Sequence, residues 1–256
     1  MPNTDVAGVR PVDIHAHFFP QEYLDVLAED GARFGVEYRA AEEGFYIKTD
    51  ARFQGPLPYR AVDLKSRISD MDANGTAVQA MSLTGPMAHW GDEEVSHKLS
   101  RAWNDAASAA HLQYPTRLYG LLTLPMLFPD RAVDELNRAS KLPGLRGVYM
   151  GTNINQRDLD DPLFEPIFAR IEQLDLPVFL HPLTVAGGPR IAPFSLANLI
   201  GAHPASHRYS SWRTGWMSSG DGGETWLELA PATAIGGQDC CSGCLWSYPA
   251  RCFLGD

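Results

Sequence analysis

Short apolar runs alternate with longer amphipathic segments along the first 200 residues of the chain. The short runs are rich in aliphatic and aromatic residues, which favours buried strands. Strands are predicted at 9–17, 76–83, 117–125, 145–151 and 176–182. The longer segments have apolar residues at helical spacing and predict helices at 60–75, 92–115, 129–143 and 161–175. Residues 20–60 show neither pattern clearly, and we expect an irregular insertion with one short helix at 21–29.

Strands that alternate with helices indicate an α/β fold with a parallel sheet covered by helices. An open, doubly wound sheet that binds nucleotides has a glycine-rich turn after its first strand. Here the first strand leads into HAHFFP (15–20), which contains no glycine. A TIM-barrel fold of the (β/α)8 type is therefore favoured, in incomplete form, because only about five βα units can be recognised.

Three histidines lie at the carboxyl ends of predicted strands, where barrel enzymes place their catalytic groups. His15 and His17 end the first strand and, being two residues apart, point to the same side of it. His181 ends the fifth strand. Neutral imidazoles suit zinc and its neighbours, so the three side chains are candidate ligands of one ion. The alternatives are an exposed pair before Pro20 and a core histidine bonded to a carbonyl group.

Composition narrows the class of partners. The chain has 256 residues, 45% hydrophobic content, a formal net charge of −10 and a pI of about 5.2. No basic stretch stands out that could neutralise phosphates, so nucleic acid is not expected as a partner. No apolar run approaches the roughly 18 residues that span a bilayer, and no charged-then-apolar leader opens the sequence. A cytoplasmic enzyme that acts on a small molecule fits best, with no membrane partner.

Five segments between residue 11 and about residue 201 carry a family signature. They read DIHAHFFPQEYL, MDANGTAVQAMS, YPTRLYGLLTLPM, GVYMGTNIN and LPVFLHP. In order and spacing they resemble the metal-dependent decarboxylase branch of the amidohydrolase superfamily, the branch of 2-amino-3-carboxymuconate 6-semialdehyde decarboxylase. The resemblance implies a TIM barrel, a bound Zn2+, Mn2+ or other divalent transition metal, and nonoxidative loss of CO2 from an unsaturated or aromatic carboxylic acid. It also implies a homodimer if the barrel is complete.

The resemblance assigns roles to four residues. His15, His17 and His181 match metal ligands of the family. Arg67, in KSRISDMD, matches an arginine that contacts the substrate carboxylate. A guanidinium suits that task because it offers a planar, permanently charged fork. The alternative for Arg67 is a solvated helix residue.

Three further histidines match no catalytic position of the family. His89 stands beside Trp90, where it could line the mouth of the pocket, but a surface position is the stronger expectation. His97 and His111 fall within the predicted helix at 92–115.

The chain departs from the family after residue 201. Residues 202–256 contain no valine and no lysine, yet they hold four of the six tryptophans and all four cysteines. The late-barrel histidine and aspartate of the family are not found there. We expect a partial barrel at 1–201 and a divergent, irregular tail at 202–256. The tail is interpreted as an altered reading frame of a longer gene, and the alternative is a genuine lineage-specific tail.

Several polar residues of the tail are candidate ligands with little support. Cys241 and Cys244 form a C-x-x-C, but zinc or redox chemistry needs a second pair or a strand–helix context, and neither is evident. His203, His207 and Asp256 could replace the missing ligands, yet an irregular tail rarely holds a ligand within the tolerance of a metal.

The resulting hypothesis is a metal-dependent decarboxylase, with weak or no turnover by this chain because its proton-handling pair is not recognised. The first alternative is a metal-dependent hydrolase of the same superfamily, since the same histidines serve both reactions. The second alternative is a nonenzymatic metal-binding fragment.

Overall fold

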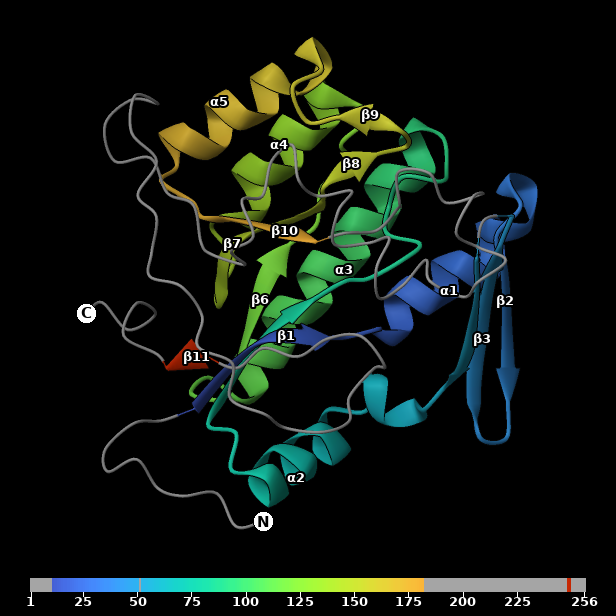
Figure 1. Ribbon diagram of the computed structural model, residues 1–256, viewed down its shortest axis with the longest axis vertical. Helices are drawn as coiled ribbons and strands as arrows, with labels where there is room; N and C mark the ends of the chain where they lie inside the picture. Colours follow the sequence, from blue (N-terminus) through green and yellow to red (C-terminus); the bar gives the residue numbers. More distant parts are fainter. Residues whose placement is uncertain (1–10, 51, 182–247, 250–256) are drawn as a thin grey trace, which may run out of the picture.

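Five parallel strands form the central sheet of the computed structural model, which describes residues 11–50, 52–181 and 248–249 (Figure 1). They are β1 (Pro11–His17), β5 (Val78–Ser82), β6 (Leu118–Leu122), β7 (Leu145–Gly151) and β10 (Val178–His181). Their order is β10-β7-β6-β5-β1, and the two-residue strand β11 (Tyr248–Pro249) pairs antiparallel with β1. All five strands predicted from the sequence are confirmed.

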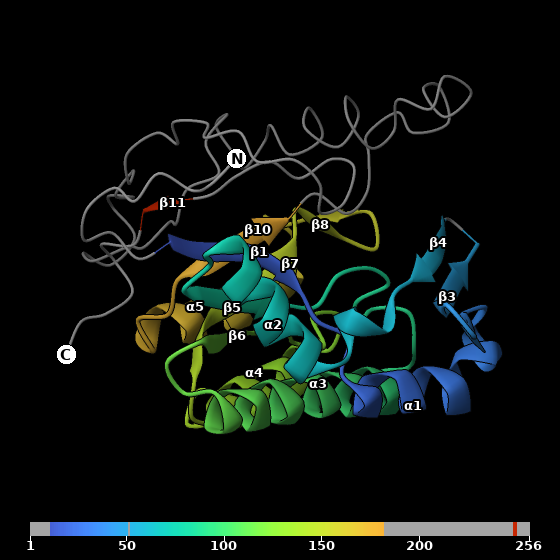
Figure 2. The same cartoon turned by 90° about the horizontal axis from the view of Figure 1, so that it is seen from below.

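Four helices lie between these strands in the chain, and each was predicted from helical spacing. They are α2 (Leu64–Asn74), α3 (Glu93–Gln113), α4 (Pro129–Ala139) and α5 (Glu165–Gln173). Figure 2 shows α3 and α4 running along one side of the sheet, which is how crossover helices cover a parallel sheet. A short hairpin, β8 (Asn153–Ile154) with β9 (Arg157–Asp158), and a 3-10 turn (Pro162–Phe164) precede α5.

Local signals in the sequence set the helix boundaries. The carboxylate of Asp63 accepts a hydrogen bond from the amide of Ser66 at 2.7 Å, and this caps the start of α2. Asp92 caps α3 in the same way, through the amide of Val95 at 3.0 Å. Gly75 ends α2 with a φ of +71°, a left-handed conformation that glycine adopts without steric strain.

The long helix α3 packs closely on the sheet. Trp103 of α3 is fully buried, and its indole Nε1 donates to the carbonyl of Phe18, just beyond β1, at 3.1 Å. In β6, a Cβ added at Gly120 would lie 3.0 Å from the Cβ of Ala107 on α3. The same Cβ would lie 2.5 Å from the Cδ2 of Leu145 on β7, so a side chain at Gly120 would force its neighbours to shift, because protein interiors leave no spare volume for it.

The sheet is curled rather than flat, as a barrel requires. β1 and β10 form the two sides of the five-stranded array, separated by four strand spacings. In a flat sheet they would stand about 19 Å apart, at roughly 4.8 Å per spacing. Yet the Nε2 atoms of His15 on β1 and His181 on β10 are only 3.0 Å apart. Side chains from the two outer strands meet because the sheet curves around them, and the expected TIM-barrel type of fold, with five βα units described, is confirmed.

The insertion at 20–60 is more regular than expected. The predicted short helix is present as α1 (Gln21–Asp30), followed by a 3-10 turn (Gly31–Phe34). The rest was wrongly expected to be irregular, because it contains a three-stranded antiparallel sheet. Its strands are β2 (Glu37–Ala41), β3 (Gly44–Thr49) and β4 (Arg52–Leu57), and a further 3-10 turn (Tyr59–Ala61) leads to α2. Figures 1 and 2 show this small sheet at the side of the molecule, beyond α1.

The reason for this error lies in the central strand of the small sheet. Phe45 and Ile47 of β3 are buried, whereas Tyr46 and Lys48 beside them are more exposed. Phe45 packs edge-to-face on Phe19 with ring centroids 5.5 Å apart, which joins the insertion to the end of β1. A two-residue period this short is easily hidden by the surrounding glycines and prolines.

The tail expected at 202–256 lies outside the described residues, except for the backbone of β11. The same holds for the predictions that concern Cys241, Cys244, His203, His207 and Asp256. None of the helices in the described ranges combines the length and the apolar character that a membrane crossing requires.

Candidate metal centre

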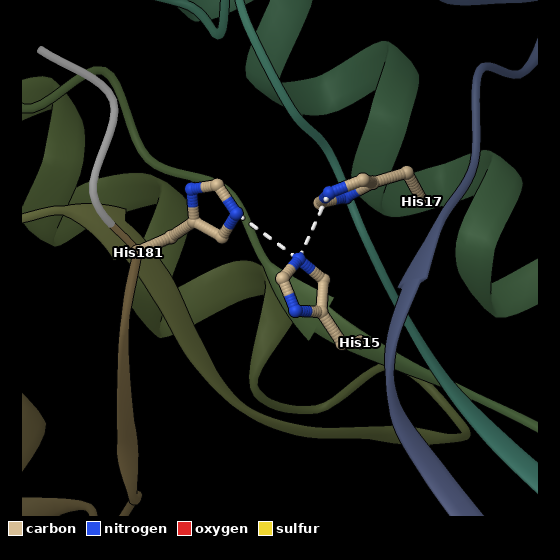
Figure 3. Close-up of side chains that lie close together, drawn as sticks. All are labelled: His15, His17 and His181. Atoms are coloured by element: carbon tan, nitrogen blue, oxygen red, sulfur yellow. Dashed lines mark hydrogen bonds between the residues drawn. The ribbon is translucent and has the colours of Figure 1, made fainter. Parts of the chain in front are cut away.

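The three histidines predicted as ligands lie together at the carboxyl ends of β1 and β10 (Figure 3). The Nε2 atom of His15 is 3.1 Å from that of His17 and 3.0 Å from that of His181. The rings are steeply inclined to one another, at 76 to 89°, with centroids 4.8 to 5.4 Å apart. Within residues 11–50 and 52–181, this histidine triad is the one group of three or more His, Cys, Asp or Glu side chains close enough to share an ion.

The facing nitrogens fit a divalent cation better than they fit one another. A neutral imidazole has one N–H donor and one lone pair, so the Nε2 of His15 cannot form a good hydrogen bond with both neighbours at once. A cation accepts all three lone pairs. Zinc–nitrogen bonds of about 2.0–2.1 Å in tetrahedral geometry separate the ligand atoms by about 3.4 Å, close to the two distances from the Nε2 of His15. The donor set therefore fits a transition metal.

Ser82, the last residue of β5, orients one of the three rings. Its hydroxyl lies 3.2 Å from the Nδ1 of His17, and the two residues are register partners across β1 and β5. When Nδ1–H donates to the hydroxyl, the lone pair of His17 is left on Nε2, on the side of the other two histidines. Such a second hydrogen bond fixes the tautomer of a metal-binding histidine.

A bulge in β1 shapes the His-x-His segment. Asp13 pairs with Gln79 and Ala16 with Met81, so β1 takes three steps where β5 takes two. The amide of His15 falls within this irregular stretch and donates instead to the carboxylate of Asp13 at 3.0 Å. Bulges of this kind re-aim side chains next to functional sites.

Arg67 completes a hydrogen-bonded frame around the same segment. The side-chain nitrogen of Gln79 donates to the carboxylate of Asp13 at 3.0 Å, and its side-chain oxygen accepts from the guanidinium of Arg67 at 3.0 Å. The Nη2 of Arg67 also donates to the carbonyl of His17 at 2.6 Å. The frame thus ties the amide of His15 to the carbonyl of His17. The alternative of a solvated Arg67 is wrong, because the residue is only 8% exposed.

Burial keeps the histidines of β1 uncharged. It lowers the pKa of His15, and the nearby Asp13 carboxylate opposes this shift only in part. Burial also lowers the pKa of His17 well below its usual value, and the neighbouring His181 and His15 lower it further. Both imidazoles are therefore neutral near pH 7, the form in which histidine binds a metal.

His89 lies in the loop after β5 and is buried, with 7% of its surface exposed. The expected surface position was wrong. The loop is drawn inward because the hydroxyl of the buried Tyr23 donates to the carbonyl of Met87 at 2.7 Å. No feature of the local sequence reveals this contact, which joins residues 64 positions apart.

The remaining two described histidines lie on α3 and make structural contacts. His97 is 3.9 Å from the buried carboxylate of Glu135 on α4. The Nδ1 of His111 is 2.7 Å from the carbonyl of Leu118 in β6. Neither belongs to the histidine triad, as expected. The supporting residues Asp13, Gln79 and Ser82 were missed, and only the position of Asp13, two residues before His15, hints at their role.

A curled parallel sheet with histidines at its carboxyl edge is typical of metal-dependent barrel enzymes. The chain belongs to the amidohydrolase family, which it matches over residues 12–229. This match continues past residue 201, where the resemblance was expected to end.

Curated relatives are decarboxylases. The chain is 26% identical over 193 residues to 2-amino-3-carboxymuconate-6-semialdehyde decarboxylase of Dictyostelium discoideum, covering 74% of this chain and 54% of the relative. It is 28% identical over 134 residues to gamma-resorcylate decarboxylase of a Rhizobium species, covering 49% of this chain and 41% of the relative. The chain thus spans about half the length of the curated relatives that it matches. The expected decarboxylase branch of the superfamily is confirmed.

A solved structure shows the same fold. The 5-carboxyvanillate decarboxylase of Novosphingobium aromaticivorans, complexed with manganese and 4-hydroxy-3-methoxy-5-nitrobenzoic acid, superposes with a TM-score of 0.65 at 24% identity. The superposition covers 79% of this chain and 59% of that one. At this level of identity, the similarity shows the fold.

Proposed function

We propose that this chain derives from a metal-dependent, nonoxidative decarboxylase of an unsaturated or aromatic carboxylic acid. The observation that carries the proposal is the meeting of His15, His17 and His181 across the curled sheet, with the Nε2 of His15 3.0 to 3.1 Å from that of each of the other two and all three ligand atoms within 4.8 Å. The decarboxylase relatives support the reaction type, and the manganese named for one of them supports a divalent transition metal. Three neutral imidazoles also suit Zn2+, so both ions are candidates.

In this proposal, His15, His17 and His181 hold the ion, and the frame of Asp13 and Gln79 keeps the first two aimed at it. When bound, the ion supplies positive charge that orients the carboxylate and stabilises negative charge developing on the substrate. Burial of the triad strengthens that effect, because charges interact more strongly away from water.

Arg67 is a candidate contact for the substrate carboxylate. Its guanidinium donates to the carbonyl of His17, so a permanent positive charge lies next to one proposed ligand. The observed contacts also support a positioning role for Arg67 in holding the end of β1. A homodimer and a cytoplasmic location stay predictions from the family resemblance and the composition.

The test is metal content together with product analysis on the full chain. Purified protein is loaded with Zn2+ or Mn2+, dialysed and assayed for bound metal, and then incubated with 2,6-dihydroxybenzoate. One ion per chain is expected, with loss of about 100-fold or more in affinity in His181→Ala and no loss in His97→Ala, because His97 on α3 does not belong to the histidine triad. Slow release of CO2 would support the decarboxylase. Release of an acid with an alcohol or amine from ester or amide substrates would indicate the hydrolase instead. Metal binding without any turnover would indicate a nonenzymatic fragment, and absence of metal would refute the proposal.

A further inference from the structure

Buried polar atoms without a hydrogen-bond partner gather at one edge of the sheet. In the described part of the chain, they include both ring nitrogens of His89, the hydroxyls of Thr123 and Thr152, and the side-chain oxygen of Asn153. Each such group destabilises the fold if nothing satisfies it, and natural domains contain few of them. Their concentration at one place therefore points to a ligand.

The topology places these groups at the carboxyl ends of three adjacent strands. Thr123 directly follows β6, and Thr152 directly follows β7. His89 lies in the loop that follows β5, and the order of the strands is β7-β6-β5. In barrel enzymes the carboxyl ends of the strands form the floor of the active site. We call His89, Thr123, Thr152 and Asn153 the polar wall.

The loop that carries His89 reaches across the end of β6. The side-chain amide of Asn155, in the turn between β8 and β9, donates to the carbonyl of His89 at 2.9 Å. The loops after β5 and β7 thus meet, with β6 and its Thr123 between those strands in the sheet. Met87 holds a left-handed φ of 62°, and its carbonyl accepts from both Tyr23 and Trp90. A non-glycine residue keeps such a conformation only where the surroundings enforce it, often near functional sites.

The polar wall adjoins the histidine triad. The backbone amide of Thr152 donates to the backbone carbonyl of His181 at 3.0 Å, so one residue of the polar wall is hydrogen-bonded directly to a proposed metal ligand. Tyr149, three residues before Thr152, also contacts the triad, because its ring centroid is 5.5 Å from that of His181. A small molecule held at the triad by its carboxylate would therefore have the polar wall within its reach.

The wall carries donors and acceptors but no charge. Burial lowers the pKa of His89 to about 4, so its imidazole is neutral near pH 7, with one N–H donor and one acceptor nitrogen. The two hydroxyls donate and accept, and the Asn153 oxygen accepts. These groups suit a hydroxyl or carbonyl substituent, whereas a second carboxylate would have to be desolvated without a cation to pair with it.

We propose that His89, together with Thr123, is a specificity-determining residue that hydrogen-bonds a neutral hydroxyl or carbonyl substituent of the carboxylate substrate. The inference rests on the proposed function and identifies the residues that recognise the substituents of the substrate.

The test compares binding of benzoate with binding of its three monohydroxy isomers to the full, Mn2+-loaded chain by calorimetry. At least one hydroxybenzoate is expected to bind about tenfold more tightly than benzoate, since one hydrogen bond contributes about 1.4 kcal/mol. His89→Phe removes both ring nitrogens at similar size and should abolish this gain while leaving benzoate affinity unchanged. His89→Gln, which retains a donor and an acceptor, should restore part of it. His97→Phe makes the same chemical change on α3 and should keep the full gain.

Thr123→Val provides an independent variant in case His89→Phe fails to fold. It deletes one hydroxyl with almost no change of shape, and it should reduce the gain. An unchanged gain in His89→Phe and in Thr123→Val would overturn the inference and leave the proposed function standing. An equal loss for benzoate and hydroxybenzoate would indicate a merely structural role for His89 and would also overturn it. If the metal-loaded chain binds none of the four acids, the proposed function fails and the inference fails with it.

Discussion

The buried His89 makes the stability of this protein depend on pH in a way that a single substitution can isolate. Its imidazole is 7% exposed and neither ring nitrogen has a hydrogen-bond partner. Burial lowers its pKa from 6.5 to about 4 in the folded protein, whereas the unfolded chain keeps the ordinary value. Between these two values the unfolded state binds a proton that the folded state does not. The free energy of unfolding therefore falls as the pH is lowered from 6.5 towards 4.

The size of this effect follows from the two pKa values. A difference of about 2.5 units, at about 1.4 kcal/mol per unit, amounts to about 3 kcal/mol of stability lost between neutral pH and pH 4. The substitution His89→Phe removes the titrating group and fills the same buried space. We expect the variant to be as stable as the parent at pH 7, or more stable, because it removes two unsatisfied polar atoms. Its stability should fall less steeply in acid.

The assay is urea unfolding of both proteins at pH 7.0, 6.0, 5.0 and 4.5, in the presence of a chelator. The pH-dependent contributions of His15, His17 and the carboxylates are common to both proteins and cancel in the difference. His97→Phe serves as the matched control. Burial lowers the pKa of His97 as well, but Glu135 opposes the shift and the side chain is partly exposed, so the control curve should stay close to that of the parent. Parallel stability curves for the parent and His89→Phe would refute the placement of His89 as a buried, unpaired imidazole.

Two further predictions concern the residues that support the site. Glu135 is fully buried and accepts hydrogen bonds from Asn104 and Arg138. Glu135→Ala should therefore reduce the free energy of unfolding, measured by denaturant titration, by about 3 kcal/mol. The control is Glu37→Ala, which removes an exposed carboxylate and should have little effect. Ser82→Ala removes the hydroxyl beside His17 and should weaken metal binding about 10-fold in a competition titration without lowering the melting temperature of the metal-free protein; equal affinity would contradict the orienting role of that hydroxyl.

The sequence predicts the barrel strands well because the pattern of apolar residues that indicates each strand is local. Each strand is a short apolar run between helices, and such runs are visible without any knowledge of the fold. The histidine triad follows from the same information, since His15, His17 and His181 each end a predicted strand. What the sequence cannot supply is the curvature that brings strands 166 positions apart into contact. A flat sheet would have the same strands and no triad.

The errors have a common physical cause. The burial of His89 depends on a hydrogen bond from Tyr23 to the loop of Met87, a contact between distant segments. The small sheet in the insertion depends on packing of Phe45 against Phe19. In both cases tertiary contacts decide the outcome, and local preference is weak or misleading. Similarly, Gln79 looks like an ordinary polar residue in a strand until Asp13 and Arg67 are placed beside it.

The arrangement around β1 distinguishes a functional site from a merely tolerated cluster of histidines. Three imidazoles packed together in a partly buried place are unfavourable, because their nitrogens cannot all be satisfied by one another. Apolar side chains of similar size would fill this space at lower cost. Instead, a bulge, the carboxylate of Asp13, the amide of Gln79 and the hydroxyl of Ser82 all hold the two histidines of β1 in one orientation. Polar support of this kind is typical around metal ligands, so the frame supports the proposed ion site independently of the family to which the chain belongs.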